Sequence, residues 1–71
     1  MMLESISETI KNRRQELKLT QPYLANMADV SVNTIFKIEN GEANPTLEVL
    51  EKILEVLGME IQLTIKDLNR I

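Results

Sequence analysis

The sequence predicts a mainly α-helical fold, in which a compact bundle of four helices is followed by a single β-strand. Three observations lead to this prediction. Apolar residues recur every three or four positions through most of the first 57 residues, which is the helical period. A Ser or Thr stands at the expected start of each helical segment, and glycines follow the last two. After Gly58 the apolar residues occupy alternate positions instead, which is the period of a strand.

The first predicted helix starts at a capping box formed by residues 5–8, in which Ser5 is the N-cap and Glu8 reaches back. An apolar stripe follows, made of Ile6, Ile10 and Leu17. The same stripe passes through Arg13 or Arg14, and a charge on a buried stripe is costly unless it is paired. Two interpretations stay open at this point: both arginines are solvated, or Arg14 pairs with an acidic residue elsewhere, for which Glu39 is the candidate.

The second predicted helix follows Thr20, which can act as its N-cap, and Pro22 lies in its first turn, where a missing N–H does no harm. Its inward-facing residues are predicted to be Leu24, Ala25 and Ala28. The small alanines allow another helix to approach closely. Asp29 tolerates the left-handed backbone conformation and can turn the chain directly afterwards.

The third predicted helix covers residues 32–40, with Ser31 as N-cap and Gly41 at its end. At 100° per residue, Ile35 and Ile38 share a core face, and Glu39 lies near its edge. The opposite face is not explained by core packing, and it carries Asn33, Phe36, Lys37 and Asn40, with Val32 at its margin.

The fourth predicted helix follows a chain break at Asn44-Pro45, is capped by Thr46 and runs to Leu57 before Gly58. Its core stripe consists of Leu47, Leu50, Ile53, Leu54 and Leu57. Its acidic face, which we interpret as solvated surface, consists of Glu48, Glu51 and Glu55.

The only predicted strand covers residues 59–66, where apolar and polar residues alternate. Its apolar residues, the candidate dimerisation residues, are Met59, Ile61, Leu63 and Ile65. A lone strand leaves its backbone groups unpaired, so it needs a second strand. We therefore predict antiparallel pairing with the same strand of a second subunit. Two alternatives stay open: an extended tail packed over its own helices, and a fifth helix.

Composition limits the function. The 71 residues include no Cys and no His, which excludes disulfides, thiolate metal sites and the commonest catalytic base, and we expect no metal or cofactor. So small a core usually needs a disulfide, a metal or a partner subunit, and only the partner subunit is left. No apolar run approaches the roughly 18 residues of a membrane span, and the start does not match a signal peptide, so we expect a soluble cytoplasmic protein.

The net charge of −3 lies entirely in residues 42–71, because residues 1–41 carry five acidic and five basic residues. The overall acidity therefore does not settle whether the first part of the chain binds nucleic acid.

Several short motifs occur together at fixed spacings: Thr20-Gln21, Leu24-Ala25, Val30-Ser31, Thr34-Ile35, Lys37-Ile38-Glu39-Asn40-Gly41 and Pro45-Thr46-Leu47. With these motifs, residues 6–58 resemble the phage repressor and Cro-like family of helix-turn-helix regulators, also called Xre-type. The segment after Gly58 departs from the simplest members. It is similar instead to the C-terminal strand of Hip-type antitoxins, in which two subunits share a two-stranded sheet.

The resemblance implies a repressor-like fold in which residues 1–58 are a helix-turn-helix DNA-binding domain and residues 59–71 are a dimerisation strand and tail. The third helix would enter the major groove. Base contacts fall to Val32, Asn33 and Lys37. Phosphate contacts fall to Gln21, Ser31, Thr34, Phe36 and Asn40. Arg14 and Glu39 match positions that form a semi-buried ion pair between the first and third helices.

These assignments together predict a transcriptional regulator, most simply a repressor, that binds a palindromic operator in double-stranded DNA as a homodimer. The resemblance also suggests an autoregulating antitoxin with a cognate toxin as partner. The alternative is a toxin-binding module that keeps the fold without binding DNA, which the net acidity and the single base on the outer face of the third helix favour. An enzyme is not expected, because the chain lacks His, Cys and a glycine-rich phosphate loop.

Overall fold

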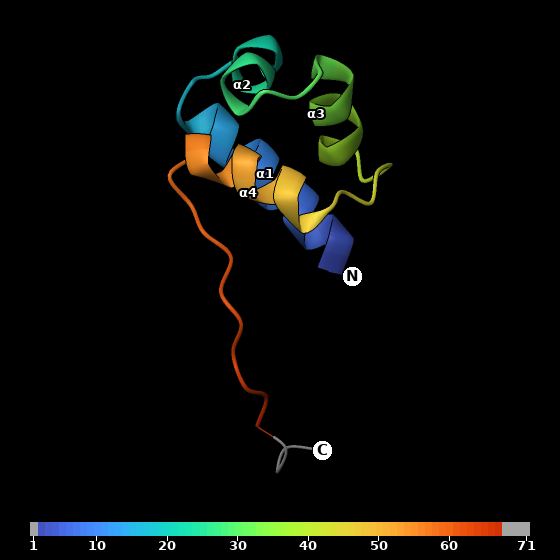
Figure 1. The fold of residues 1–71 in the computed structure, drawn as a ribbon, viewed down its shortest axis with the longest axis vertical. Coiled ribbons are helices and arrows are strands. Elements are labelled where there is room, and N and C mark those ends of the chain that lie inside the picture. Colours follow the sequence, from blue (N-terminus) through green and yellow to red (C-terminus); the bar gives the residue numbers. More distant parts are fainter. Residues whose placement is uncertain (1, 68–71) are drawn as a thin grey trace.

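The structure, a computed structural model, describes residues 2–67 and contains four α-helices in that range (Figure 1). Their bounds are Met2–Glu16 for α1, Gln21–Ala28 for α2, Val32–Glu39 for α3 and Leu47–Val56 for α4. α2 contacts both α3 and α4, and α3 contacts α1. The predicted mainly α fold with four helices is confirmed. None of the described helices is long and apolar enough to cross a bilayer.

The core is built from apolar side chains of all four helices, and the fully or nearly fully buried ones are Ile10, Leu24, Ala25, Ala28, Ile35, Ile38, Leu50, Ile53, Leu54 and Leu57. The inward faces predicted for the second and third helices are therefore confirmed. Two predicted stripe residues are not buried: Leu17 is 39% exposed and Leu47 is 67% exposed. Leu17 follows the end of α1, and Leu47 is the first residue of α4, so both lie at edges of the bundle.

Three of the four predicted helix starts carry the expected cap. The hydroxyls of Thr20, Ser31 and Thr46 each accept a hydrogen bond, at 3.1 Å, from the backbone N–H three residues later. The start predicted at Ser5 is wrong, because α1 already begins at Met2. Met, Leu and Glu are good helix formers, so the residues before Ser5 extend the helix instead of ending it.

All four helices end in the same way, with one residue in the left-handed conformation. These residues are Lys18, Asp29, Gly41 and Gly58, with φ between 57° and 71°. The N–H of the next residue then donates to the carbonyl five residues earlier, at 2.8–3.0 Å, which is the bond pattern of a Schellman motif. Only two of the four positions are glycine, so Lys18 and Asp29 adopt a conformation that is costly for a residue with a Cβ atom.

The C-terminal segment, residues 59–67, leaves the bundle as an extended chain (Figure 1). The strand predicted over residues 59–66 does not form in the single chain, which corrects that expectation; the described residues contain no second strand to which it could bond. A fifth helix is also excluded for these residues. Met59 packs against the core, whereas Leu63 is 95% exposed and Ile65 is 98% exposed. Residues 68–71 of the predicted tail lie outside the described residues.

Candidate nucleic-acid interface

α2 and α3 form two short helices joined by a tight turn. Each is eight residues long, and only residues 29–31 connect them. Asp29 makes the turn with φ 57°, and the N–H of Val30 closes it on the carbonyl of Ala25 at 3.0 Å. The buried Ala25 and Ala28 allow α3 to come close to α2. This is the local geometry that the sequence predicts for a helix-turn-helix.

The C-terminal end of α3 is fixed to α1 by one ion pair, at the positions where the sequence predicts it. Nε of Arg14 lies 2.7 Å from one carboxylate oxygen of Glu39, and Nη2 lies 3.0 Å from the other. The side chains are 12% and 1% exposed. Nη1 of Arg14 also donates to the carbonyl of Leu19 at 2.7 Å. The hydrogen bond to Glu39 raises the pKa of the Arg14 guanidinium, although burial acts to lower it.

Gln21, a predicted phosphate contact, makes a third bond to the same acid. Its amide Nε2 donates to Glu39 Oε1 at 3.1 Å. One carboxylate therefore joins α1, α2 and α3. An amide nitrogen carries two hydrogens, so the second hydrogen of Gln21 stays available to a ligand. This bond could not be predicted from the sequence, because the two residues lie 18 positions apart and an uncharged amide on a helix does not require a buried partner.

The outer face of α3 presents the predicted base-contact residues together. Val32 is 46% exposed, and Asn33 and Lys37 are also exposed. Phe36, on the same face, is 48% exposed, and Asn40 is exposed at the end of the helix. The structure thus brings these five side chains to one solvent-facing surface, because residues three or four positions apart share a face of a helix.

The two hydroxyls predicted as phosphate contacts are engaged with each other. Ser31 Oγ lies 2.8 Å from Thr34 Oγ1, and it also accepts the N–H of Thr34 at 3.1 Å. Their first role is therefore to hold the start of α3. One of the two hydroxyl hydrogens is spent in this contact and the other remains able to donate.

Arg13 takes a structural role that the sequence did not identify. Its Nε donates to the carbonyl of Leu57 at 2.9 Å, which ties α1 to the end of α4. Its Nη1 forms an ion pair with Glu16 at 2.6 Å. Both arginines of α1 therefore bind other parts of the chain. Lys37 is the basic residue on the outer face of α3.

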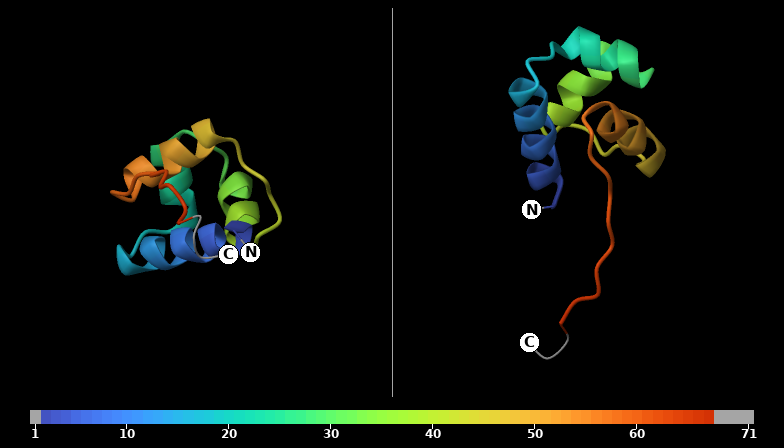
Figure 2. Two further views of the ribbon diagram at one scale, coloured as in Figure 1. Left: turned by 90° about the horizontal axis from the view of Figure 1, so that it is seen from below. Right: turned by 90° about the vertical axis from the view of Figure 1, so that its left-hand side faces the viewer.

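The predicted dimerisation residues lie on a different side of the molecule. Figure 2 shows the C-terminal segment running between α1 and α4 and away from α2. Within the part of the chain that the structure describes, no group of three or more acidic residues is arranged to hold a metal ion.

The comparisons with known proteins agree with this geometry. Residues 10–63 match the helix-turn-helix family HTH_3. The chain belongs to this family. It is 37% identical over 57 residues to the immunity repressor protein of Bacillus phage phi105, covering 80% of this chain and 40% of that protein. It is 36% identical over 56 residues to the transcriptional repressor RstR of the cryptic phage CTXphi of Vibrio cholerae, covering 79% and 50%.

A mutant of the restriction-modification controller protein C.Esp1396I has a similar structure, with a TM-score of 0.80, 32% identity, and coverage of 84% of this chain and 78% of that one. The sequence-based assignment to Xre-type helix-turn-helix regulators is confirmed, and the two phage relatives are named as repressors. The Hip-type character of the C-terminal segment is not shown by them. The chain spans half or less of the length of the two phage repressors.

Proposed function

We propose that this protein is a sequence-specific DNA-binding transcriptional regulator, most simply a repressor. The observation that carries the proposal is the outer face of α3: an exposed, largely polar surface on a helix whose angle is set by the buried Arg14–Glu39 pair. Membership of the HTH_3 family, which includes phage repressors, supports it.

The base contacts that we propose follow from the chemistry of three exposed side chains. Val32 can touch a thymine methyl group, Asn33 can bind adenine through two hydrogen bonds, and Lys37 can donate to guanine O6 and N7. Each good contact contributes roughly 1–3 kcal/mol of discrimination between bases.

The phosphate contacts that we propose flank this surface. The Gln21 amide donates to Glu39, the residue directly before Asn40, so Gln21 and Asn40 both lie near the C-terminal end of α3. The second amide hydrogen of Gln21 and the side chain of Asn40 each suit a phosphate oxygen. Ser31 and Thr34 can offer their remaining hydroxyl hydrogen at the start of α3, where the helix dipole also favours an anion. Phe36 has no donor, so its contribution is apolar contact with the sugar-phosphate backbone.

We further propose that residues 59–71 join two copies into a homodimer that binds a palindromic operator. Two copies of α3 would then read half-sites about one helical turn apart. The small core and the exposed apolar residues of the C-terminal segment support a second subunit. Only the resemblance of this segment to Hip-type antitoxins supports an antitoxin role with a toxin partner.

The test is selection of duplexes from a random DNA pool at two salt concentrations, followed by sequencing. The expected result is a palindrome, and Lys37→Ala should relax base preference at one position of each half-site. Lys52→Ala is the matched control, because Lys52 is an exposed lysine of α4. Absence of binding at low salt would overturn the proposal and favour the protein-interaction module, for which the net charge of −3 is the supporting observation.

A further inference from the structure

An open apolar groove of about 690 Å³ lies between α1, α4 and the C-terminal segment. The apolar side chains that line it include Ile6, Ile10, Leu47, Leu50, Leu54 and Leu63. Met59 and Ile61 from the chain's own C-terminal segment also line it, yet Leu47 remains 67% exposed. The segment therefore covers the groove only in part.

The apolar face of the C-terminal segment continues past the body of its own chain. Residues of equal parity point to the same side of an extended chain, so Met59, Ile61, Leu63 and Ile65 share one face. Exposure rises along this face, from 40% at Ile61 to 95% at Leu63 and 98% at Ile65. The start of the face rests on the bundle, and its end has nothing to cover it within the described residues.

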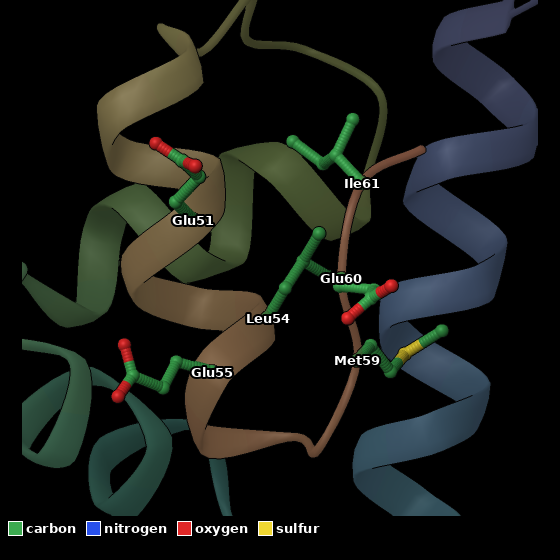
Figure 3. Close-up of a pocket in the computed structure, with 6 residues that line it drawn as sticks. All are labelled: Glu51, Leu54, Glu55, Met59, Glu60 and Ile61. Atoms are coloured by element: carbon green, nitrogen blue, oxygen red, sulfur yellow. The ribbon is translucent and has the colours of Figure 1, made fainter. Parts of the chain in front are cut away.

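A second hollow, of about 450 Å³, adjoins this groove and is acidic. Figure 3 shows its lining, with the carboxylates of Glu51, Glu55 and Glu60 around the apolar Leu54, Met59 and Ile61. Lys66 is exposed on the same segment as Glu60, six residues further along. In extended chain that is roughly 20 Å, so Lys66 cannot reach the hollow of its own molecule.

We propose that a second copy of this chain covers the groove, with the two C-terminal segments paired antiparallel and centred on Leu63. This inference rests on the homodimer of the proposed function and specifies its register. Leu63 lies opposite Leu63 of the partner subunit, and Ile61 lies opposite Ile65 of the partner subunit. Glu60 then lies opposite Lys66 of the partner subunit, which brings a cation to the acidic hollow.

Charge and parity select this register over its neighbours. A shift by one residue places apolar residues opposite polar ones and sends the two apolar faces to opposite sides. A shift by two residues keeps the faces together but places Lys66 opposite Gly58 or Gln62, so no opposite charges meet. The register centred on Leu63 pairs Glu60 with Lys66 twice, by symmetry, and Gln62 with Thr64 twice. Directly opposed unlike charges stabilise an antiparallel pair.

The first test uses single cysteines, because the chain has none of its own. A residue at the two-fold axis meets itself at a Cα separation of about 4.5–5.5 Å, which a disulfide spans. Under mild oxidation Leu63→Cys should give a covalent dimer, whereas Ile61→Cys and Ile65→Cys should link only when mixed. The strongest self-linking at Ile61, Gln62, Thr64 or Ile65 would overturn the register.

The second test reverses charges and follows the dimer dissociation constant by sedimentation equilibrium. Glu60→Lys should weaken the dimer roughly 2- to 30-fold, because two attractive pairs become repulsive. Adding Lys66→Glu to Glu60→Lys should restore the dissociation constant. The control is Glu42→Lys, which changes an exposed acidic residue distant from Glu60 in the sequence and should leave the dissociation constant unchanged. A dimer insensitive to Glu60→Lys overturns the inference.

DNA binding by the same variants separates the two proposals. A chain that stays monomeric at all concentrations contradicts the homodimer itself. A chain that dimerises and binds a palindrome, yet links through other positions, contradicts only the register.

Discussion

Replacing Glu39 by Ala should destabilise the protein by about 2–4 kcal/mol. The Glu39 side chain is 1% exposed and satisfies both Arg14 and Gln21. Removing one partner of a buried pair usually costs about 3–5 kcal/mol, since the other charge stays buried. We expect somewhat less here, because Arg14 is 12% exposed and keeps its bond to the carbonyl of Leu19. A domain of 71 residues has about 4–10 kcal/mol in total, so the loss is large.

The assay is urea unfolding followed by far-ultraviolet circular dichroism, with Glu16→Ala as the matched control. The Arg13–Glu16 distance, 2.6 Å, is shorter than the 2.7 Å of Arg14–Glu39, but its side chains are 36% and 68% exposed. An exposed pair contributes about 0–1 kcal/mol, so Glu16→Ala should be nearly silent. Equal losses in the two variants would refute the reasoning, because burial and not distance is the basis of the difference.

The pH dependence of this pair has a definite sign. The pKa of Arg14 is raised in the folded state, so its contribution to stability is complete below the pKa of the unfolded chain. It is lost only as the pH rises through the folded value, in strongly alkaline solution. The difference between the native protein and Glu39→Ala should therefore stay constant in urea melts between neutral and mildly alkaline pH.

Four further outcomes are expected. Asp29→Gly should stabilise the protein by about 0.5 kcal/mol in the same urea assay, because relief of the left-handed strain exceeds the entropy that glycine adds to the unfolded chain. Gly58→Ala should destabilise the protein by about 1 kcal/mol, because alanine must adopt the left-handed conformation there. At Gly58 an added Cβ would lie 3.6 Å from Arg13 Nη2, an ordinary contact, so the backbone alone sets that cost. Arg13→Ala should destabilise by about 1 kcal/mol through loss of its bond to the carbonyl of Leu57. Asn40→Asp should weaken binding roughly tenfold to operator and random duplex alike in a fluorescence titration; a loss confined to the operator would contradict a phosphate contact.

Local chemistry explains which parts of the fold could be predicted from the sequence. Thr20, Ser31 and Thr46 act as caps because a cap depends only on the next three residues. Ser5 matched the same pattern, but the residues before it also favour a helix. The pattern therefore did not mark where α1 begins. A cap motif is therefore informative only where the preceding residues oppose a helix.

Long-range partners explain what could not be predicted. The bond from Gln21 to Glu39 depends on how α2 docks. The alternation over residues 59–66 predicted a strand, but a strand also needs a partner to bond, and the described residues contain none. The exposed face of α3 could be predicted because helical periodicity alone separates Lys37 from Ile38. Whether that face meets DNA bases stays a prediction until duplex selection is done.

On α3, the residues that face the solvent differ from the residue that holds the helices together. This separation affects how such a protein can change the DNA sequence that it recognises. The side chains of Asn33 and Lys37 are exposed and make no hydrogen bond to the described part of the chain, while Glu39 on the same helix holds three helices together. Surface substitutions of that kind usually change stability by less than about 0.5 kcal/mol. A lineage could therefore exchange the residues that we assign to operator choice one at a time, and each intermediate would still fold.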